Sequence, residues 1–267
     1  MRAPRAIRST GVALIAAVTS LLVVSPATAA TSVFTPASDA KVTGTITVSA
    51  ASSLTDVFPV IAKAFQKRYP GTNVKFNFGG SSTLVNQIKG GAPVDVLATA
   101  SEPTMWSAVN AGLVGKPLLF AKNTMAIAMP ADNPAHITSL ADLARPGTLV
   151  GVCAVTVPCG AAARDLFALN KVTVRPVTQE LDVRSLLGKV LSGDLDAAIV
   201  YVTDVKAVGK KVSSVQIPAS LNVTTTYPVA TVGKTTNPVV AQRFVDYLRY
   251  SLSAQGILRA YGFAKPW

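Results

Sequence analysis

The alternation of strand-like and helix-like segments from about residue 45 onward constrains the fold of this chain most strongly. Short apolar or alternating runs, such as residues 45–50 (TITVSA) and 197–201 (AAIVY), predict strands. Segments with apolar residues three or four positions apart, such as residues 53–69, predict helices. Pro59 inside that segment predicts a kink or a late helix start. Repeated strand–helix–strand units imply an α/β fold with mainly parallel sheets flanked by helices.

The same patterns place the remaining elements along the chain. Strands are predicted at residues 45–50, 73–78, 94–99, 124–129, 148–152, 172–177, 197–201 and 227–232. Helices are predicted at residues 53–69, 82–89, 102–111, 140–144, 160–169, 183–191, 238–250 and 254–261. This length indicates two sheets with separate small cores. We expect two lobes, formed by residues 45–122 with 233–267 and by residues 123–232.

The first 29 residues have the pattern of a secretory signal peptide. Three arginines precede an apolar run at residues 11–24, and residues 27–29 (ATA) form a small-residue cleavage site. An N-terminal membrane anchor is the alternative, but the apolar run is short for a span. No cysteine lies at the cleavage site, so no lipid anchor is expected. Residues 30–44 are expected to form a flexible leader on a soluble protein exported to the periplasm or the extracellular space.

The charge balance favours an anionic partner without indicating nucleic acid. The chain of 267 residues carries 25 basic and 13 acidic residues, for a net charge of +12, and its hydrophobic fraction of 49% is ample for a core. A basic surface can attract small anions, anionic lipid or nucleic acid. The longest basic run is the pair Lys210-Lys211, and few aromatic residues are interleaved with basic ones. We therefore expect no nucleic-acid binding and some long-range steering of an anion.

The sequence gives little support to an enzyme. Its one histidine, His136, lies in a loop-like segment without a nucleophile elbow or a catalytic cysteine nearby. No metal-ligand spacing or glycine-rich phosphate loop is present. Five aspartates are scattered along the chain, at Asp95, Asp182, Asp194, Asp196 and Asp204. A secreted hydrolase or transferase remains the alternative of another class, and no cofactor is expected.

Four segments share a design that suits an anion. In each, a predicted strand ends, a short turn of small or polar residues follows, and a helix begins: residues 51–55, 79–83, 157–161 and 180–184. A helix start presents backbone N–H groups without intrahelical partners and a partial positive charge, which together favour an anion. A serine there is more often only a helix cap. Several such starts in one chain predict an anion site at the carboxyl ends of the strands.

Cys153 and Cys159 are the only cysteines. In an oxidising compartment such a pair usually forms a disulfide. We expect this bond, and two free thiols are the alternative.

Several motifs in order resemble the molybdate-binding proteins of ABC importers, which belong to the type II periplasmic binding proteins. The motifs are residues 45–54 (TITVSAASSL), 78–84 (FGGSSTL), 91–96 (GAPVDV), 157–160 (VPCG), 182–184 (DVR), 199–201 (IVY), 227–230 (YPVA) and 261–263 (YGF). The resemblance covers nearly everything between about residues 45 and 266. It implies a two-lobed clamshell that holds an oxyanion in its cleft with neutral donors.

The resemblance also implies which residues contact the ion. Ser53 and Ser81 would each donate a hydroxyl and a backbone N–H. Cys159 and Val183 would each donate a backbone N–H, and Tyr201 its hydroxyl. Molybdenum would be bound as its oxyanion, with no residue as a direct metal ligand. Many relatives have a small residue other than cysteine at position 159, and a backbone donor survives that change.

Three details of this assignment stay open. Ser52 and Ser82 leave the choice of hydroxyl in each serine pair open by one position. Without the resemblance, the favoured interpretation of Tyr201 is a tyrosine at the edge of the core whose hydroxyl finds a local partner. Arg184 is expected to be a solvated helix residue or a partner of Asp182.

The donors that the resemblance implies indicate which ions the protein binds, and the family indicates which partner receives them. A shell of N–H and O–H donors without acceptors disfavours protonated oxyanions such as phosphate. Sulfate has the charge and shape of molybdate but is smaller, and tungstate is nearly the same size. We expect molybdate and tungstate as ligands, with sulfate, phosphate or another small anion as the alternative. The partner is expected to be the membrane permease of an ABC importer, and the protein a monomer.

Overall fold

The computed structural model describes residues 42–266. The predicted signal peptide and all but the last three residues of the predicted leader lie outside this range. The described residues form an α/β fold. The strands are β1 Gly44–Ala51, β2 Thr72–Gly79, β3 Val96–Ala98, β4 Leu118–Pro130, β5 Val150–Cys153, β6 Thr178–Glu180, β7 Ala197–Tyr201, β8 Val212–Gln216 and β9 Thr224–Thr231. The α-helices are α1 Val57–Arg68, α2 Ser81–Lys89, α3 Glu102–Asn110, α4 Pro158–Asn170, α5 Val183–Leu191, α6 Val202–Val208, α7 Pro238–Tyr250 and α8 Leu252–Ala260. Four short 3-10 helices are Ser52–Leu54, Ala141–Ala144, Gly209–Lys211 and Ala219–Leu221.

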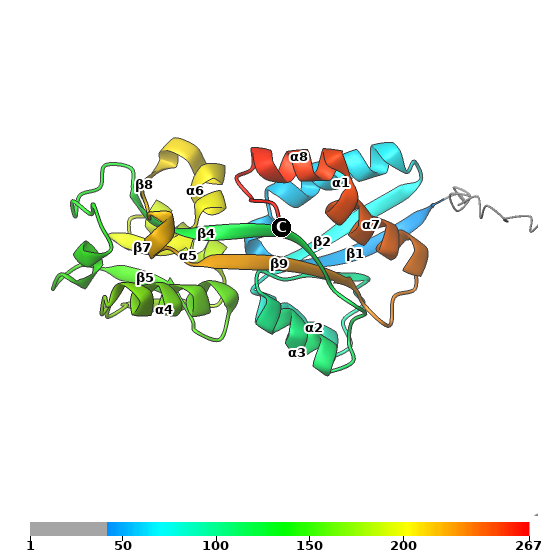
Figure 1. Ribbon diagram of the computed structural model, residues 1–267, viewed down its shortest axis with the longest axis horizontal. Coiled ribbons are helices and arrows are strands. Elements are labelled where there is room, and N and C mark those ends of the chain that lie inside the picture. The colour runs from blue at the N-terminus through cyan, green and yellow to red at the C-terminus, as the bar shows by residue number, and fades with distance from the viewer. Residues whose placement is uncertain (1–41, 267) are drawn as a thin grey trace, which may run out of the picture. The chain divides into compact units, whose positions relative to one another are not determined.

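The strands are hydrogen-bonded in the order β2-β1-β3-β9-β4-β7-β5-β6, with β8 paired to β4. The three strands β1, β2 and β3 are mutually parallel, and so are β5, β6 and β7. Between these groups, β4 and β9 run antiparallel to all their neighbours. The expectation of two sheets with separate cores was wrong for the described residues. Strands β4 and β9 join both groups into one nine-stranded sheet (Figure 1), and one hydrophobic cluster contains buried residues of both groups.

Helices cover each group of strands. We call β1–β3 with α1, α2, α3, α7 and α8 the first half, and β5–β8 with α4, α5 and α6 the second half (Figure 1). The long strand β4 pairs with β9 through Thr124 and with β7 from Met125 onward. Strand β9 pairs with β4 and then, at residues 229–231, with β3. Both strands thus pass from one half to the other.

The bounds of several helices and strands match those predicted from the sequence, and the start of one helix lies later in the chain for a clear reason. The bounds of α5, α7 and β7 are those predicted. Helix α1 begins at Val57, after a separate 3-10 turn at Ser52–Leu54, so the late start predicted from Pro59 is confirmed. Pro59 occupies the first turn of α1, where the missing N–H has no intrahelical partner.

Other predictions were wrong. Residues 172–177 form no strand, and the strand beside β5 is instead β6, whose first pair is Gly151 with Thr178. Pro176 has no N–H to donate to a ladder, which delays pairing until after it. The short helix α6 and strand β8 were not predicted.

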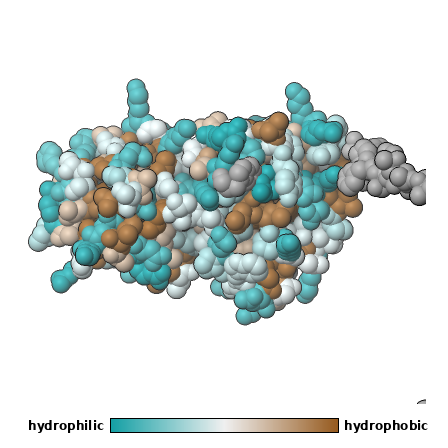
Figure 2. Space-filling model, viewed as in Figure 1, coloured by the Kyte–Doolittle hydropathy of each residue, from teal (hydrophilic) through white to brown (hydrophobic). Residues whose placement is uncertain are grey.

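The core of the first half is aromatic. Phe58 contacts Phe120 and Phe244 with ring centroids 5.8 and 6.2 Å apart, and Phe65 contacts Phe244 at 5.2 Å. All four rings are fully buried, which contributes about 1.5–3 kcal/mol each from area removed from water. The face in Figure 2 mixes small hydrophobic groups with hydrophilic residues, as is usual for surfaces in contact with water. Within residues 42–266, no helix has the length and apolar character needed to cross a bilayer.

Candidate functional site

A small cavity lies where the predicted turns meet. It is lined by residues 51–53 and 79–81 of the first half, residues 157–159 and 182–183 of the second half, and by Ala100 and Tyr201. Its volume is about 10 Å³. The structure therefore brings together all five residues singled out in the sequence: Ser53, Ser81, Cys159, Val183 and Tyr201.

Two buried serines approach the cavity from the first half. Ser53 lies in the 3-10 turn after β1, and Ser81 is the first residue of α2. The Ala100 N–H donates to Ser81 Oγ at 3.1 Å. Ser53 Oγ lies 3.0 Å from Tyr227 Oη. Because Ser81 Oγ already accepts a hydrogen bond, its own proton is free to point into the cavity.

The neighbouring serines differ in position. Ser82 donates its hydroxyl to the Thr156 carbonyl at 2.7 Å and does not line the cavity. Ser81 is therefore the serine of its pair that faces the cavity. Ser52 and Ser53 both line it, and both are buried. The choice between these two stays open by geometry alone, although Ser53 alone contacts Tyr227.

The start of α4 supplies the next donor. Cys159 is the second residue of this helix, so its N–H has no intrahelical partner. A disulfide joins Cys153 at the end of β5 to Cys159, and its Cα atoms are 5.7 Å apart. A Cβ at Gly160 would lie 2.0 Å from the Ala154 carbonyl oxygen. The disulfide loop therefore packs directly on the start of α4.

The start of α5 has a selective cap. Asp182 accepts hydrogen bonds from the N–H groups of Arg184 and Ser185 at 2.8 and 3.0 Å. Val183, the first residue of the helix, precedes both, and its N–H has no intrahelical partner. Asp182 thus occupies the second and third donors of α5 and leaves the first for the cavity.

Tyr201 ends β7 and closes the cavity from the second half. Its side chain is fully buried, and its hydroxyl has no hydrogen-bond partner among residues 42–266. A buried hydroxyl without a partner costs about 1–3 kcal/mol. Burial, followed by the proximity of Tyr227 and Asp204, raises the pKa of Tyr201 well above its ordinary value. The phenol is therefore a neutral donor that lacks an acceptor within the described chain.

Among residues 42–266, those that line the cavity include no lysine, arginine or histidine. The nearest guanidinium along the chain, that of Arg184, forms ion pairs with Asp56 and with buried Asp204. The sequence-based expectation that Arg184 is solvated or paired with Asp182 was wrong, because the Asp182 carboxylate caps backbone groups instead. An anion in the cavity would meet neutral donors only.

Asp204 lies behind Tyr201 and is fully buried. It accepts the Tyr201 N–H at 3.1 Å and lies 3.6 Å from Arg184 Nε. Burial raises the pKa of its carboxyl to about 6, although Arg184 lowers it in part. Because Arg184 also pairs with Asp56 of the first half, this cluster links the two halves beside the cavity.

Gly80 marks a close approach of the two halves. A Cβ at this position would lie 2.1 Å from the carbonyl oxygen of Leu181. No side chain fits that distance, so glycine is required wherever the halves meet as they do here. The hydrogen bond from Ser82 to Thr156 spans the same junction.

A larger hollow of about 480 Å³ shares Val157 and Pro158 with the small cavity. Its lining includes the acidic side chains of Glu102 and Asp165. Negative charge there disfavours an anion. Asp182 also lines the small cavity, but its carboxylate accepts the N–H groups of Arg184 and Ser185. Because all five predicted donors meet there, the small cavity is the better anion site despite its smaller volume.

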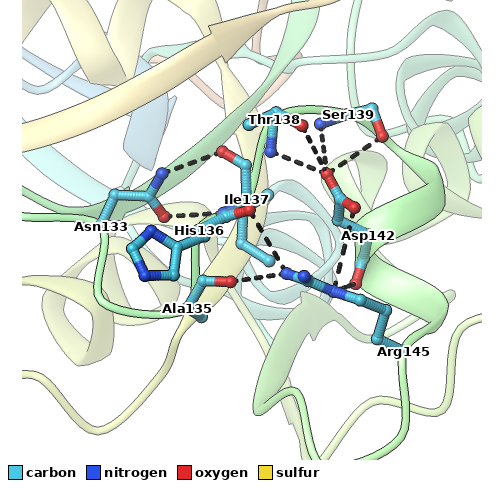
Figure 3. Close-up of polar contacts among 8 residues, drawn as sticks. All are labelled: Asn133, Ala135, His136, Ile137, Thr138, Ser139, Asp142 and Arg145. Carbon is cyan, nitrogen blue, oxygen red and sulfur yellow. Dashed lines mark hydrogen bonds and ion pairs between the residues drawn. The ribbon is translucent and has the colours of Figure 1, made fainter.

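His136 lies in an exposed loop, as expected (Figure 3). The loop is held by Asp142, which accepts hydrogen bonds from the backbone and hydroxyl groups of Thr138 and Ser139. These bonds lower the pKa of Asp142 to about 2. Arg145 donates to the carbonyl oxygens of Ala135 and His136. The polar contacts of this loop are thus structural, and residues 42–266 contain no group of three potential metal ligands.

Sequence reasoning missed the polar residues behind the cavity. Tyr227, Asn123 and Asp204 are all buried and lie within contact of the site. Tyr227 was noted only as part of the YPVA motif. A tyrosine directly before the apolar run at residues 228–230 of a strand is a usable signal, because a buried hydroxyl needs a partner.

Comparisons with known proteins show which family this chain belongs to. The family described as bacterial extracellular solute-binding protein matches residues 46–264. The chain belongs to this family. The molybdate-binding protein ModA of Mycobacterium tuberculosis (strain H37Rv) is 41% identical over 232 residues, which cover 86% of this chain and 88% of that protein. Both findings describe solute-binding proteins, which fits a binding protein rather than an enzyme.

Solved structures share the fold of this solute-binding protein. The periplasmic molybdate-binding protein of Azotobacter vinelandii superimposes with a TM-score of 0.74 at 20% identity, covering 83% of this chain and 100% of that one. The sulfate-binding protein SubI of M. tuberculosis H37Rv gives 0.70 at 22% identity, covering 83% and 86%. These likenesses establish the two-lobed clamshell fold and do not distinguish the ligand.

Proposed function

We propose that this protein captures molybdate in the small cavity and delivers it to the membrane permease of an ABC importer. The observation that carries the proposal is the convergence of neutral donors from both halves on one cavity without a cationic side chain. Ser53, Ser81 and Tyr201 supply hydroxyls, and Ser53 and Ser81 also supply their backbone N–H groups. Cys159 and Val183 supply N–H groups at helix starts. The 41% identical relative that is named a molybdate-binding protein supports the choice of ion.

The donor set favours a fully deprotonated oxyanion. Helix starts and hydroxyl protons stabilise negative charge without a formal cation. A protonated oxyanion would bury an O–H that finds no acceptor, at a cost of about 1–3 kcal/mol. Phosphate, which carries a proton near neutral pH, is therefore disfavoured. Tungstate has the charge and nearly the size of molybdate and binds comparably.

Capture requires the two halves to separate and close. We propose that residues 45–122 with 233–267 move as one lobe against residues 123–232. The hinge lies where β4 and β9 pass from one half of the molecule to the other. Strand β9 pairs with β4 and, further along, with β3, which supports a hinge within β9. The ion pair of Arg184 with Asp56 and the fit of Gly80 against Leu181 support a closed form in which donors of both lobes meet the ion. The permease then recognises the closed surface.

Isothermal titration of the purified exported protein with molybdate, tungstate, sulfate and phosphate at pH 7 tests the proposal. We expect one site that binds molybdate and tungstate with similar Kd, and sulfate at least about 100-fold more weakly because its hydrogen bonds are longer. Phosphate should give no measurable heat. Sulfate or phosphate binding as tightly as molybdate would contradict the proposal.

A further inference from the structure

A buried polar chain lies behind Ser53 and outside the cavity. Ser53 Oγ is 3.0 Å from Tyr227 Oη, which is 3.3 Å from Asn123 Nδ2. All three side chains are buried. Tyr227 and Asn123 do not line the cavity. Tyr227 also packs beside Tyr201, with ring centroids 6.0 Å apart, but Ser53 is the cavity residue whose side chain lies within hydrogen-bond distance of it.

The orientation of the Asn123 amide sets the direction of the chain. Asn123 Oδ1 accepts the N–H of Thr124 at 3.0 Å, so the oxygen faces the backbone and the NH₂ group faces inward. The two amide protons go to Thr203 Oγ1 at 2.7 Å and to Tyr227 Oη. Tyr227 Oη is thus already an acceptor.

The single proton of Tyr227 then has one partner. Ser53 Oγ is the acceptor within hydrogen-bond distance, so Tyr227 donates to Ser53. Burial raises the pKa of Tyr227 above its ordinary value, so the phenol keeps this proton. Ser53 Oγ, having accepted from Tyr227, directs its own proton into the cavity. Ser81 is set in the same way by the N–H of Ala100.

We infer that Tyr227 and Asn123 are positioning residues that fix Ser53 as a hydrogen-bond donor to the bound oxyanion, and so set the preference for fully deprotonated ions. The inference rests on the proposed function and deepens it. If Ser53 turned its proton back to Tyr227 to accept from a protonated oxyanion, Tyr227 would receive two hydrogen bonds and its own proton would lose its partner. A buried donor left unpaired is costly, so the chain resists reversal.

A double-mutant cycle with Tyr227→Phe and Ser53→Ala tests the coupling, with molybdate affinity measured by titration calorimetry. Tyr227→Phe alone should weaken molybdate binding about tenfold, the effect of about 1.4 kcal/mol. In the Ser53→Ala background the same change should weaken binding less than about twofold, because its effect passes through Ser53. Any general loss of stability cancels between the two arms of the cycle.

A matched control and a second readout separate positioning from structural support. The control Tyr247→Phe removes a tyrosine hydroxyl in the first half, outside the cavity lining. The Tyr247 ring packs on Phe65 with the ring centroids 5.4 Å apart. This change should leave the molybdate Kd unchanged. Competition by phosphate at pH 6 reads the selectivity. In Tyr227→Phe, the phosphate Kd divided by the molybdate Kd should fall at least about threefold, because Ser53 is then free to accept a hydrogen bond from the protonated phosphate.

Equal losses from Tyr227→Phe with and without Ser53, or an unchanged phosphate-to-molybdate ratio, would overturn the inference. Binding of sulfate in place of molybdate by the wild-type protein would contradict the proposed function alone. The same cycle is then measured with sulfate and still decides whether Tyr227 acts through Ser53.

Discussion

The two walls of the cavity present donors of different kinds. The first half contributes the side-chain hydroxyls of Ser53 and Ser81, and each oxygen is held from behind by another group. The second half contributes the backbone N–H groups of Cys159 and Val183 and the hydroxyl of Tyr201. Side-chain donors depend on residue identity, whereas backbone donors depend on how the chain is held. The two walls should therefore respond differently to substitution.

The largest effect is expected on the first wall. Replacing both Ser53 and Ser81 by Ala removes two hydrogen bonds to a charged ion, each contributing about 1.5–3 kcal/mol. We expect molybdate Kd to rise at least about 100-fold in titration calorimetry, while the unfolding temperature of the ligand-free protein changes little. Retention of affinity within about threefold of the wild type would show that the ion binds elsewhere.

Substitutions at two glycines distinguish the effect of contact between the two walls from the effect of packing within one wall. Gly80→Ala places a Cβ against Leu181 of the opposite half, so it should weaken molybdate binding at least about tenfold with little change in unfolding. Gly160→Ala places a Cβ against Ala154 within the second half, so it should lower the free energy of unfolding by about 2 kcal/mol. Calorimetry and urea denaturation of both variants measure the contrast. Identical profiles for the two would contradict it.

Removing the disulfide tests how firmly the second wall is held. Cys153→Ser with Cys159→Ser opens a short loop, since the cysteines are six residues apart. The chain-entropy effect predicts a loss of about 2 kcal/mol in the free energy of unfolding. The Cys159→Ser variant keeps the N–H at the start of α4, so we expect molybdate Kd to rise no more than about threefold. A tenfold or larger rise in Kd would mean that the disulfide itself orients the donor.

The smallest effect concerns the buried carboxyl behind Tyr201. Burial raises the pKa of Asp204 from 3.8 to about 6. Between these values the folded state binds the proton more tightly than the unfolded state does, so ionisation at higher pH costs stability. Relative to Asp204→Asn, the wild type should gain stability on the order of 1 kcal/mol as the pH falls from 7 to 4.5. Urea denaturation at both pH values measures this, and an unchanged difference would contradict the raised pKa.

The sequence predicted the donors of the second wall better than the buried polar residues that lie behind the cavity. Helix α5 was placed correctly because Asp182 is a good cap and apolar residues recur with helical spacing after it. The start of α4 was predicted at residue 160, two residues late, and the disulfide was anticipated from local patterns. A free N–H at a helix start is a local property, so a local pattern suffices to find it.

The chain behind Ser53 is not local. Ser53 and Tyr227 are 174 positions apart, and Asn123 and Tyr227 are 104 apart. The ion pairs of Arg184 with Asp56 and Asp204 likewise join distant elements. No periodicity in the sequence indicates which buried polar residues meet across β4 and β9. The missed strand β6 has a simpler cause, since Pro176 displaces pairing from an apolar run to the polar residues after it.

A crystal structure of the protein with bound molybdate tests most directly the claim that neutral donors alone hold the ion. We expect its oxygens to accept hydrogen bonds from the hydroxyls of Ser53, Ser81 and Tyr201 and from the N–H groups of Cys159 and Val183. The Arg184 guanidinium should remain with Asp56 and Asp204. A lysine or arginine nitrogen within hydrogen-bond distance of the ion, or an ion bound outside this cavity, would contradict the account.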